Sequence, residues 1–457
     1  MRTEKDSMGT MEVPDNALYG ASTQRAVVNF PVSGHPMPAL FIRSCGLLKY
    51  ACAQANLALE RINQEKADAI SIAALEIYEG KHRAHFPLDV FQTGSGTSTN
   101  MNINEVIANR CSQLAGQPIG SKIPVHPNDD CNLGQSSNDT MPTALHLSVA
   151  LALQQELKPA LQLLSKALDK KTRAFKKVVK IGRTHLMDAT PITLGQEFSG
   201  YVRQIKKALT RTDHAIVTLK ELAIGGTAVG TGINGHPDFA QAVVTILNEK
   251  TQLHFIEAKN HFEAQAGRDD CVDVAGQLQA ISASLTKIAN DIRLLGSGPR
   301  CGLGELQLPA TQPGSSIMPG KVNPVMCEML VQACLYANSQ CQTVVACGRE
   351  GHFELNATIP LIAYSLHEAI QVLANSAILF TERCVAGLQV NEPAIAQYLE
   401  NSLMLVTALN PHIGYDKASH VAKRAFAEGR TLREIVLEEK LMSAKSVDNA
   451  LNPKKMV

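Results

Sequence analysis

Apolar residues recur at helical spacing along most of the chain. In its first part, residues 37–70 and 72–84 carry them three or four positions apart, which predicts helices. Residues 143–177 show a longer amphipathic stripe, made of Leu145, Val149, Leu153, Leu157, Leu161, Leu164 and Leu168. Pro159 lies inside this stripe and predicts a kink rather than the end of the helix, because proline removes one backbone hydrogen bond.

Further helical patterns cover residues 196–222, 237–249, 264–295, 324–346 and 359–386. Several long helices in one stretch favour a bundle of antiparallel helices. Loops and shorter helices alternate up to about residue 135, and the helical pattern shortens again near residue 390. We therefore expect an all-α fold with three domains, which comprise residues 1–135, 136–390 and 391–457.

The bulk composition narrows the class of protein. The 457 residues are 45% hydrophobic and 19% charged, with a formal net charge of +1, which gives no reason to expect a nucleic-acid or membrane partner. Aromatic residues make up 4% and tryptophan is absent, which favours packed helices over a β-sandwich. The first residues have neither the apolar run of a signal peptide nor the character of a transit peptide, so we expect a soluble, cytoplasmic protein.

The eleven cysteines include no C-x-x-C pair. Cys327, Cys334 and Cys341 recur every seven residues and therefore lie near one helix face. This spacing favours buried thiols in a reducing compartment over disulfides or a metal site.

The most distinctive stretch is Gly314–Glu328, which reads GSSIMPGKVNPVMCE. Its Gly and Pro residues indicate a loop, and its two hydroxyls, Lys321 and Asn323 suit a site that grips a small anion. A phosphate loop is excluded, because the spacing between Gly314 and Gly320 is wrong and Val322 follows the lysine. An ordinary solvated loop is the remaining alternative.

Two polar stretches precede helices. Residues 91–110 read FQTGSGTSTNMNINEVIANR and become helical from about Asn102; their Ser, Thr and Gly residues suit an anion site or a simple linker. In HPNDDCNLGQSSND, at residues 126–139, Ser136, Ser137 and Asn138 are good caps for the helix that begins by Thr143. The side chains and free N–H groups of such a turn can hold a carboxylate.

The same stretch suggests a metal site at His126, Asp129, Asp130 and Cys131. We reject it, because the four residues lack a recognisable ligand spacing.

A basic run at residues 170–180 precedes GRTHLMDATPITLGQE, and such a run is usually a solvated helix face. Thr184 and His185 follow it, before a turn through Pro191 and a helix from about Leu194. A lone histidine is more often structural than catalytic, and His185 becomes a catalytic candidate only if Glu328 or another carboxylate reaches it.

Together these groups suit removal of a proton beside a carboxylate. The developing dianion requires preorganised donors and positive charge, which Lys321, Asn323 and loop N–H groups supply. A general base and a general acid must act on neighbouring carbons. Neither a G-x-S-x-G elbow nor a dinucleotide fingerprint is present.

GSSIMPGKVNP resembles the signature loop of the aspartase/fumarase superfamily. The likeness covers nearly the whole chain, through RTEKDSMG, TGSGTSTNMNINE, HPNDD, QSSND, GRTHL and HIGYDK. The chain is similar to class II fumarases, which implies reversible hydration of fumarate to L-malate through an enediolate, without metal or organic cofactor. The resemblance also implies a central five-helix bundle that joins three others in a homotetramer, with active sites shared between three subunits.

The resemblance assigns roles to individual residues. It implies that Ser315 is the base, and that His185, supported by Glu328, is the acid and water-activating residue. The residues implied to bind the substrate carboxylates are Ser95, Thr97, Ser136, Ser137, Asn138, Thr184, Lys321 and Asn323. A second anion site is implied at His126, Asn128 and Asp129.

Two stretches depart from the fumarase pattern. Lys122 is the only nearby base before HPNDD, where fumarases usually have an arginine, so the chain departs from the fumarase pattern at the second anion site. FEAQAGRDDCVDV is more charged than usual. Two roles stay open for Arg268 and Asp269, an extra ion pair between subunits and altered contacts of the loop.

Aspartate ammonia-lyase is the main alternative within the superfamily. Aspartases more often show NPNDH, QSTND and PAKVNP, whereas this chain has HPNDD, QSSND and PGKVNP. A non-catalytic structural protein of the same fold, as some lens crystallins are, is a remote alternative. The complete set of Ser315, Lys321, Asn323, His185 and Glu328 argues against it.

Overall fold

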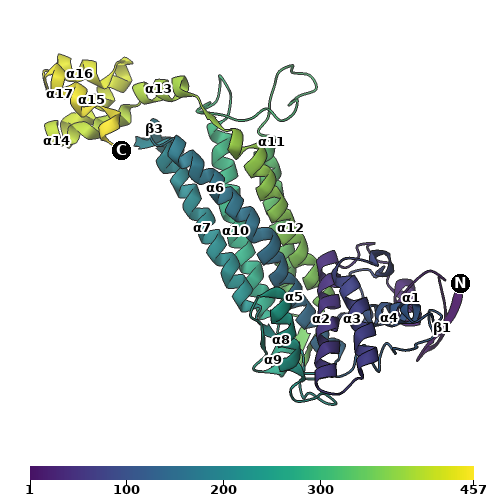
Figure 1. The fold of residues 1–457 in the computed structure, drawn as a ribbon. Helices are drawn as coiled ribbons and strands as arrows, with labels where there is room; N and C mark the ends of the chain where they lie inside the picture. The colour runs from purple at the N-terminus through teal and green to yellow at the C-terminus, as the bar shows by residue number, and fades with distance from the viewer. The chain divides into compact units, whose positions relative to one another are not determined.

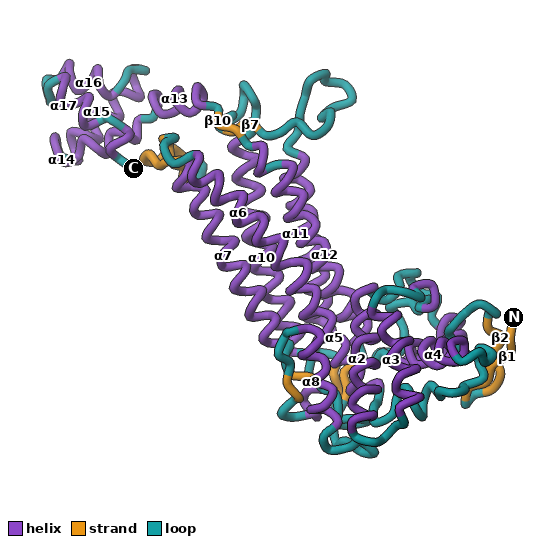
Figure 2. Tube along the Cα trace, viewed as in Figure 1, coloured by secondary structure: helices purple, strands orange, loops and turns teal.

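The computed structural model describes residues 1–457, and its regular structure is almost entirely helical (Figures 1 and 2). Seventeen α-helices alternate with strands of seven residues or fewer, which pair only two by two. The expected all-α class is confirmed. None of the helices combines the length and the apolar character that a bilayer crossing requires.

The chain forms two compact units, each built from three segments. The first unit comprises residues 1–159, 209–282 and 333–374, and the second comprises 160–208, 283–332 and 375–457. Long helices contribute residues to both units. The division into three domains along the sequence stays a prediction.

The first unit begins with an antiparallel hairpin and four helices. These are β1 (Arg2–Asp6), β2 (Gly9–Val13), α1 (Ala21–Asn29), α2 (Ala39–Ala58), α3 (Gln64–Tyr78) and α4 (Thr97–Leu114). It also contains α8 (Phe239–Thr251), α9 (His261–Ala266), β5 (Glu221–Leu222), β6 (Ile256–Glu257), β8 (Gly351–His352) and β9 (Leu355–Asn356). Helix α2 packs against α3, α5 and α8, and α3 packs against α4.

The predicted break at residue 71, between helices at 37–70 and 72–84, is wrong, because the boundary between α2 and α3 lies earlier in the chain. Helix α2 ends at Ala58, and Asn63 caps α3 by accepting a 3.0 Å hydrogen bond from the Lys66 N–H. Glu60, in the connection, has a positive φ of 55°. Apolar periodicity continues across this short turn, so the capping residue, and not the periodicity, marks the boundary.

Five long helical rods form the bundle, and Figures 1 and 2 show them together. They are α5 (Ser137–Ala152) continued by α6 (Lys158–Ala174), α7 (Leu194–Thr218), α10 (Asp269–Leu295), α11 (Val325–Gly348) and α12 (Ile359–Arg383). Their apolar sides are buried, including Leu145, Leu153, Leu161 and Leu168 of the predicted stripe. The predicted five-helix bundle is confirmed.

Pro159 disturbs the first rod without ending it, as expected. One π-helical turn at Leu153–Leu157 precedes it, and the rod stays helical on both sides. Proline cannot donate the hydrogen bond of an α-helix, and a wider turn accommodates the carbonyl that this leaves free.

Polar contacts join neighbouring rods within each unit. In the first unit, His367 Nε2 lies 2.9 Å from Ser148 Oγ, joining α12 to α5. In the second unit, the Tyr201 hydroxyl donates to Asp291 at 2.9 Å, joining α7 to α10. Cys327, Cys334 and Cys341 are fully buried thiols, as their seven-residue spacing predicts.

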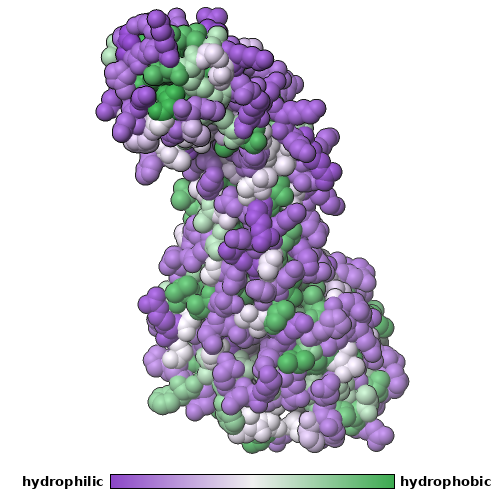
Figure 3. Space-filling model, turned by 90° about the vertical axis from the view of Figure 1, so that its left-hand side faces the viewer, coloured by the Kyte–Doolittle hydropathy of each residue, from purple (hydrophilic) through white to green (hydrophobic).

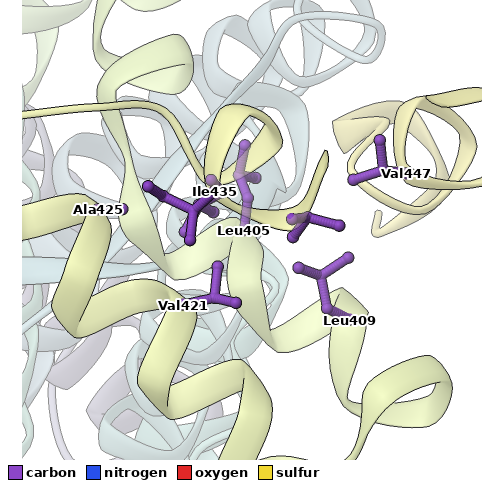
Figure 4. Close-up of a cluster of buried hydrophobic side chains, with 8 residues drawn as sticks. Leu405, Leu409, Val421, Ala425, Ile435 and Val447 are labelled. Carbon is purple, nitrogen blue, oxygen red and sulfur yellow. The ribbon is translucent and has the colours of Figure 1, made fainter. Parts of the chain in front are cut away.

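The second unit also holds the short strands near the bundle and the C-terminal helices. Its strands are β3 (Val179–Thr184), β4 (Met187–Thr193), β7 (Leu306–Gln307) and β10 (Gln389–Val390). Its last helices are α13 (Glu392–Asn401), α14 (Asn410–Ile413), α15 (Tyr415–Glu428), α16 (Leu432–Glu438) and α17 (Ala444–Ala450). Their core gathers Leu405, Leu409, Val421, Ala425, Ile435 and Val447 (Figure 4).

The interpretation of residues 170–180 as a solvated helix face is wrong for Lys180, which is buried in strand β3. Its side chain is 2% exposed, and Nζ lies 3.0 Å from Glu197 and 3.1 Å from the fully buried Glu305. Arg183 Nη1 lies 2.7 Å from the other oxygen of Glu305. The two contacts of Glu305 have ion-pair distances but not hydrogen-bond geometry. This cluster ties strand β3 to the residues immediately before β7.

We expect Glu305→Gln to lower the free energy of unfolding by about 3 kcal/mol, because it leaves the buried Lys180 and the partly buried Arg183 beside a neutral amide. Urea unfolding at fixed protein concentration, followed by circular dichroism, measures this change. Glu79→Gln, in an exposed ion pair with Lys81, is the matched control and should unfold like the wild type. Equal unfolding midpoints for all three proteins would show that the buried cluster adds no stability.

Candidate functional site

The first turns of α4 and α5 bring five of the predicted residues together. We call Ser95, Thr97, Ser136, Ser137 and Asn138 the hydroxyl cradle. Asn100, in the first turn of α4, donates a 3.0 Å hydrogen bond to Ser137 Oγ and so joins the two helix starts. Ser95 and Thr97 share a hydrogen bond of 2.8 Å between their hydroxyls. The cradle lies within the first unit.

Glycines shape the chain before α4. Gly96 precedes the helix with φ 79°, a backbone conformation that glycine adopts without strain. A Cβ on Gly94 would lie 1.8 Å from the Ala357 carbonyl oxygen, so only glycine fits this close approach. The helix therefore begins at Thr97, five residues earlier than the predicted Asn102, and its first turn carries the threonine hydroxyl.

Asp139 organises the start of α5. Ser136 caps this helix, as predicted, and its own N–H donates to Asp139 Oδ1 at 2.9 Å, which completes a capping box. Asp139 Oδ2 accepts hydrogen bonds from the N–H groups of Gly225 and Thr227 at 3.1 and 2.9 Å. Burial raises the pKa of the Asp139 carboxyl to about 6.

The loop at 225–228 contacts the cradle through Asn138 as well. Asn138 Nδ2 donates to the Ala228 carbonyl at 2.7 Å, which fixes the orientation of its amide. Two helix N-termini, three serine hydroxyls and one threonine hydroxyl thus lie in one part of the first unit. Free N–H groups and the positive ends of helix dipoles favour a bound carboxylate.

Thr184 and His185 lie at the tip of a hairpin that sequence patterns did not predict. Thr184 pairs with Met187, so His185 and Leu186 form a two-residue turn between β3 and β4. Both have positive φ, 55° and 62°, where asparagine and glycine are usual. Strained backbone at non-glycine residues often marks a functional site, and here it holds His185 exposed at the tip.

Glu328 lies in the first turn of α11, as predicted. The side chains of His185 and Glu328 have no hydrogen-bond or ion-pair partner within the chain, so their pairing stays a prediction. Both belong to the second unit, together with Thr184, Ser315, Lys321 and Asn323.

The signature loop closes on itself at its base. The Gly314 N–H donates to the Lys321 carbonyl at 2.8 Å, and Asn323 Nδ2 donates to the Gly314 carbonyl at 2.6 Å. Within the loop, Ser315 Oγ accepts hydrogen bonds from the N–H groups of Ile317 and Met318 at 3.3 and 3.0 Å. A hollow of about 400 Å³ lies against residues 310–315 and 320–322. Lys321 is exposed there, and its ammonium has no partner in the chain.

The residues predicted for the second anion site contact one another. His126 Nδ1 lies 3.2 Å from Asp129 Oδ2 and accepts hydrogen bonds from the N–H groups of Asn128 and Asp129. Lys66 pairs with the neighbouring Asp130 at 2.8 Å, and Lys122 is exposed. The function of this site stays a prediction.

Arg268 is 2% exposed, and one of its terminal nitrogens donates to the Ala264 carbonyl. Burial lowers the pKa of its guanidinium. Asp269 begins α10, where a carboxylate favours the helix N-terminus. Both side chains belong to the first unit, whereas the signature loop belongs to the second.

Sequence patterns did not identify the residues that position the site but have no proposed part in the reaction. Asp139 ends the QSSND motif, and its position three residues after the Ser136 cap was the available signal. Glu305 and Lys180 gave no such signal, because their pairing spans more than a hundred residues. A cavity of about 650 Å³ lies among C-terminal residues such as Leu399, Phe426 and Leu432 and includes none of the predicted residues.

Two family models match the chain. A model described as "Lyase" matches residues 9–337, and one described as "Fumarase C C-terminus" matches residues 405–457. Together they cover the cradle, the hairpin tip, the signature loop and most of the C-terminal helices.

Full-length relatives agree with these models. The class II fumarate hydratase of Neisseria meningitidis is 49% identical over 456 residues, which cover 100% of this chain and 99% of the relative. The human mitochondrial fumarate hydratase is 49% identical over 458 residues, which cover 100% of this chain and 90% of the relative. The crystal structure of a class II fumarase from Schistosoma mansoni superposes with a TM-score of 0.97 at 41% identity, and the match covers 100% of this chain and 98% of that one. The chain belongs to the class II fumarate hydratases.

Proposed function

We propose that the chain catalyses the reversible hydration of fumarate to L-malate. The observation that carries this proposal is the environment of Ser315. Its Oγ accepts two backbone N–H groups from its own loop, at Ile317 and Met318. A serine is a poor base unless its alkoxide is stabilised, and such donors stabilise the alkoxide more than the alcohol.

The hydroxyl cradle is proposed to bind one carboxylate of the substrate. Its serine and threonine hydroxyls and the N-termini of α4 and α5 present donors to an anion. Thr184, Lys321 and Asn323, from the second unit, are proposed to bind the remaining negative charge. The unpaired ammonium of Lys321 is available for this role.

In the direction of dehydration, Ser315 Oγ takes the proton from C3 of malate. The electron pair of the broken C–H bond moves into the adjoining carboxylate and forms the enediolate. Lys321 and loop N–H groups stabilise this developing dianion. The C2–O bond then breaks, the C2–C3 double bond forms, and the departing hydroxide leaves as water.

His185 is proposed to give the departing hydroxide its proton and, in the reverse reaction, to orient and deprotonate the attacking water. A carboxylate beside an imidazole raises the pKa of the imidazole and fixes its tautomer. Glu328 is the proposed carboxylate. Since no contact joins the two within one chain, we propose that the pair forms when copies of the chain assemble.

We propose a homotetramer whose active sites combine residues from three subunits. The cradle belongs to one unit of the chain, and Ser315, His185 and Lys321 belong to the other. Large apolar side chains are exposed on the long helices, among them Leu335 at 62% and Val217 at 58%. Figure 3 shows hydrophobic atoms interspersed with hydrophilic ones over one face of the molecule. The exposed apolar side chains of the long helices are the support that this chain offers for the proposed assembly.

The absence of a metal or organic cofactor, the cytoplasmic location and a role for the second anion site stay predictions. Aspartate ammonia-lyase stays the alternative activity, since it acts on the same carbon skeleton with an amine in place of the hydroxyl.

The substrate assay separates these two activities. Purified protein with a chelator present should produce the ultraviolet absorbance of fumarate from L-malate and not from L-aspartate. Absorbance that grows with aspartate alone would make the chain an ammonia-lyase. Absence of turnover with both would exclude the proposed function.

Ser315→Ala should abolish turnover, because it removes the atom that takes the C3 proton. The expected loss is at least about a hundredfold in kcat, the scale for removing an acid/base group. Ser316→Ala is the matched control, since this neighbouring side chain is exposed and has no assigned role. Circular dichroism should be unchanged in both variants. A near-wild-type rate for Ser315→Ala would remove Ser315 as the base.

A further inference from the structure

Lys49 is a buried cation in the apolar helix α2. Its side chain is 1% exposed, and its helix neighbours Leu47, Leu48 and Ala51 are fully buried. Lysine is almost never fully buried unless it is paired, because its charge loses hydration. Burial accordingly lowers the pKa of this ammonium.

No carboxylate forms an ion pair with Lys49. Its Nζ donates to two neutral amide oxygens, Asn132 Oδ1 at 3.1 Å and Gln135 Oε1 at 2.9 Å. Asp139 is a nearby acid, but hydrogen bonds from Ser136, Thr140, Gly225 and Thr227 occupy its two oxygens. The positive charge is therefore directed at amide groups rather than neutralised by direct contact.

A chain of hydrogen bonds connects Lys49 to the hydroxyl cradle. Asn132 Oδ1, which accepts from Lys49, also accepts from Asn100 Nδ2 at 3.1 Å. Asn100 Nδ2 donates in turn to Ser137 Oγ at 3.0 Å. Because Ser137 Oγ accepts this bond, its own proton is free to point at a ligand. Asn104 donates to the same Asn132 oxygen at 3.3 Å.

This network is incompletely satisfied in the chain alone. The Oδ1 atoms of Asn100 and Asn104 are buried and have no hydrogen-bond partner. An uncompensated buried cation and unpaired buried amides both cost stability. Such costs are retained mainly where function requires them.

We propose that Lys49 is a positioning residue of the substrate site: its charge orients Ser137 through Asn132 and Asn100, and complements the carboxylate that the cradle binds. This inference rests on the proposed function. It assigns the substrate-binding charge of the first unit to a residue that does not itself touch substrate. An anion in the cradle supplies the negative charge that the buried ammonium lacks.

A structural tie between α2 and residues 132–135 is the competing explanation, and two substitutions distinguish it. Lys49→Met removes both the charge and the donors at similar volume. Lys49→Gln removes the charge and keeps an amide that can donate to Asn132 or Gln135. If Lys49 only links α2 to residues 132–135, Lys49→Gln should restore the stability and the substrate binding that Lys49→Met loses. Under our proposal, both variants bind substrate equally poorly.

The measurements are the KM and kcat for L-malate and fumarate, with thermal unfolding in the presence and absence of malate. We expect both variants to raise KM at least about tenfold, or 1.4 kcal/mol of binding free energy, while kcat falls by less than about threefold. The ligand-free Tm should be unchanged or higher, because an unpaired charge is removed from the interior. The increase in Tm that malate produces should shrink.

Lys66→Met is the matched control, since it removes the same charge from a lysine that pairs with Asp130 outside the cradle. It should leave KM unchanged. A wild-type KM in Lys49→Gln would overturn the proposal, and so would a lower Tm with unchanged KM in Lys49→Met. If Lys49→Met fails to fold, Lys49→Gln alone decides. A wild-type protein that turns over no malate would instead defeat the proposed function.

Discussion

The buried carboxylate of Asp139 is the contact on which the candidate binding site depends. One of its oxygens closes the capping box at the start of α5, and the other holds the backbone at Gly225 and Thr227. These bonds fix Ser136, Ser137 and Asn138 in the first turn of the helix. If Asp139 lost them, the cradle would lose both its helix start and its neighbouring loop.

The bundle explains why the candidate catalytic and binding residues lie at the ends of helices and strands. The rods bury apolar stripes, and a buried polar group without a partner costs about 1–3 kcal/mol. Helix starts, in contrast, offer unpaired N–H groups that require an acceptor. Thr97 and Ser137 begin helices, Glu328 lies in a first turn, and His185 occupies a hairpin tip. The long helices thus provide rigid supports, and their ends provide donors.

Local signals in the sequence predicted much of this arrangement. Heptad-spaced cysteines indicated buried thiols, and Ser136 was identified as a cap because the capping chemistry depends on residues only three positions apart. The long rods followed from their apolar period, and their ends lie within six residues of the predicted bounds. Between α2 and α3, the short turn at Glu60 left the apolar period unbroken, so the boundary was missed.

Features that depend on distant residues escaped sequence reasoning. Lys180 looked like part of a solvated basic run, and only the fold brings Glu305 beside it. Lys49 is a buried cation in a largely apolar helix, and its partners Asn132 and Gln135 lie more than eighty residues away. The hairpin tip escaped because His185 and Leu186 adopt a turn conformation that their residue types disfavour.

The central claim is that the loop of one copy acts on substrate held by the cradle of another. Mixing two inactive variants tests it most directly. Ser315→Ala removes the base, and Ser137→Asp places a repelling charge in the cradle. Co-expression with two different tags allows mixed assemblies to be purified, which the proposal takes to be tetramers. If base and cradle come from different copies, random mixing leaves roughly a quarter of the sites intact, so activity returns to about that fraction of wild type. Mixed tetramers that stay inactive would show that each site takes both groups from one chain.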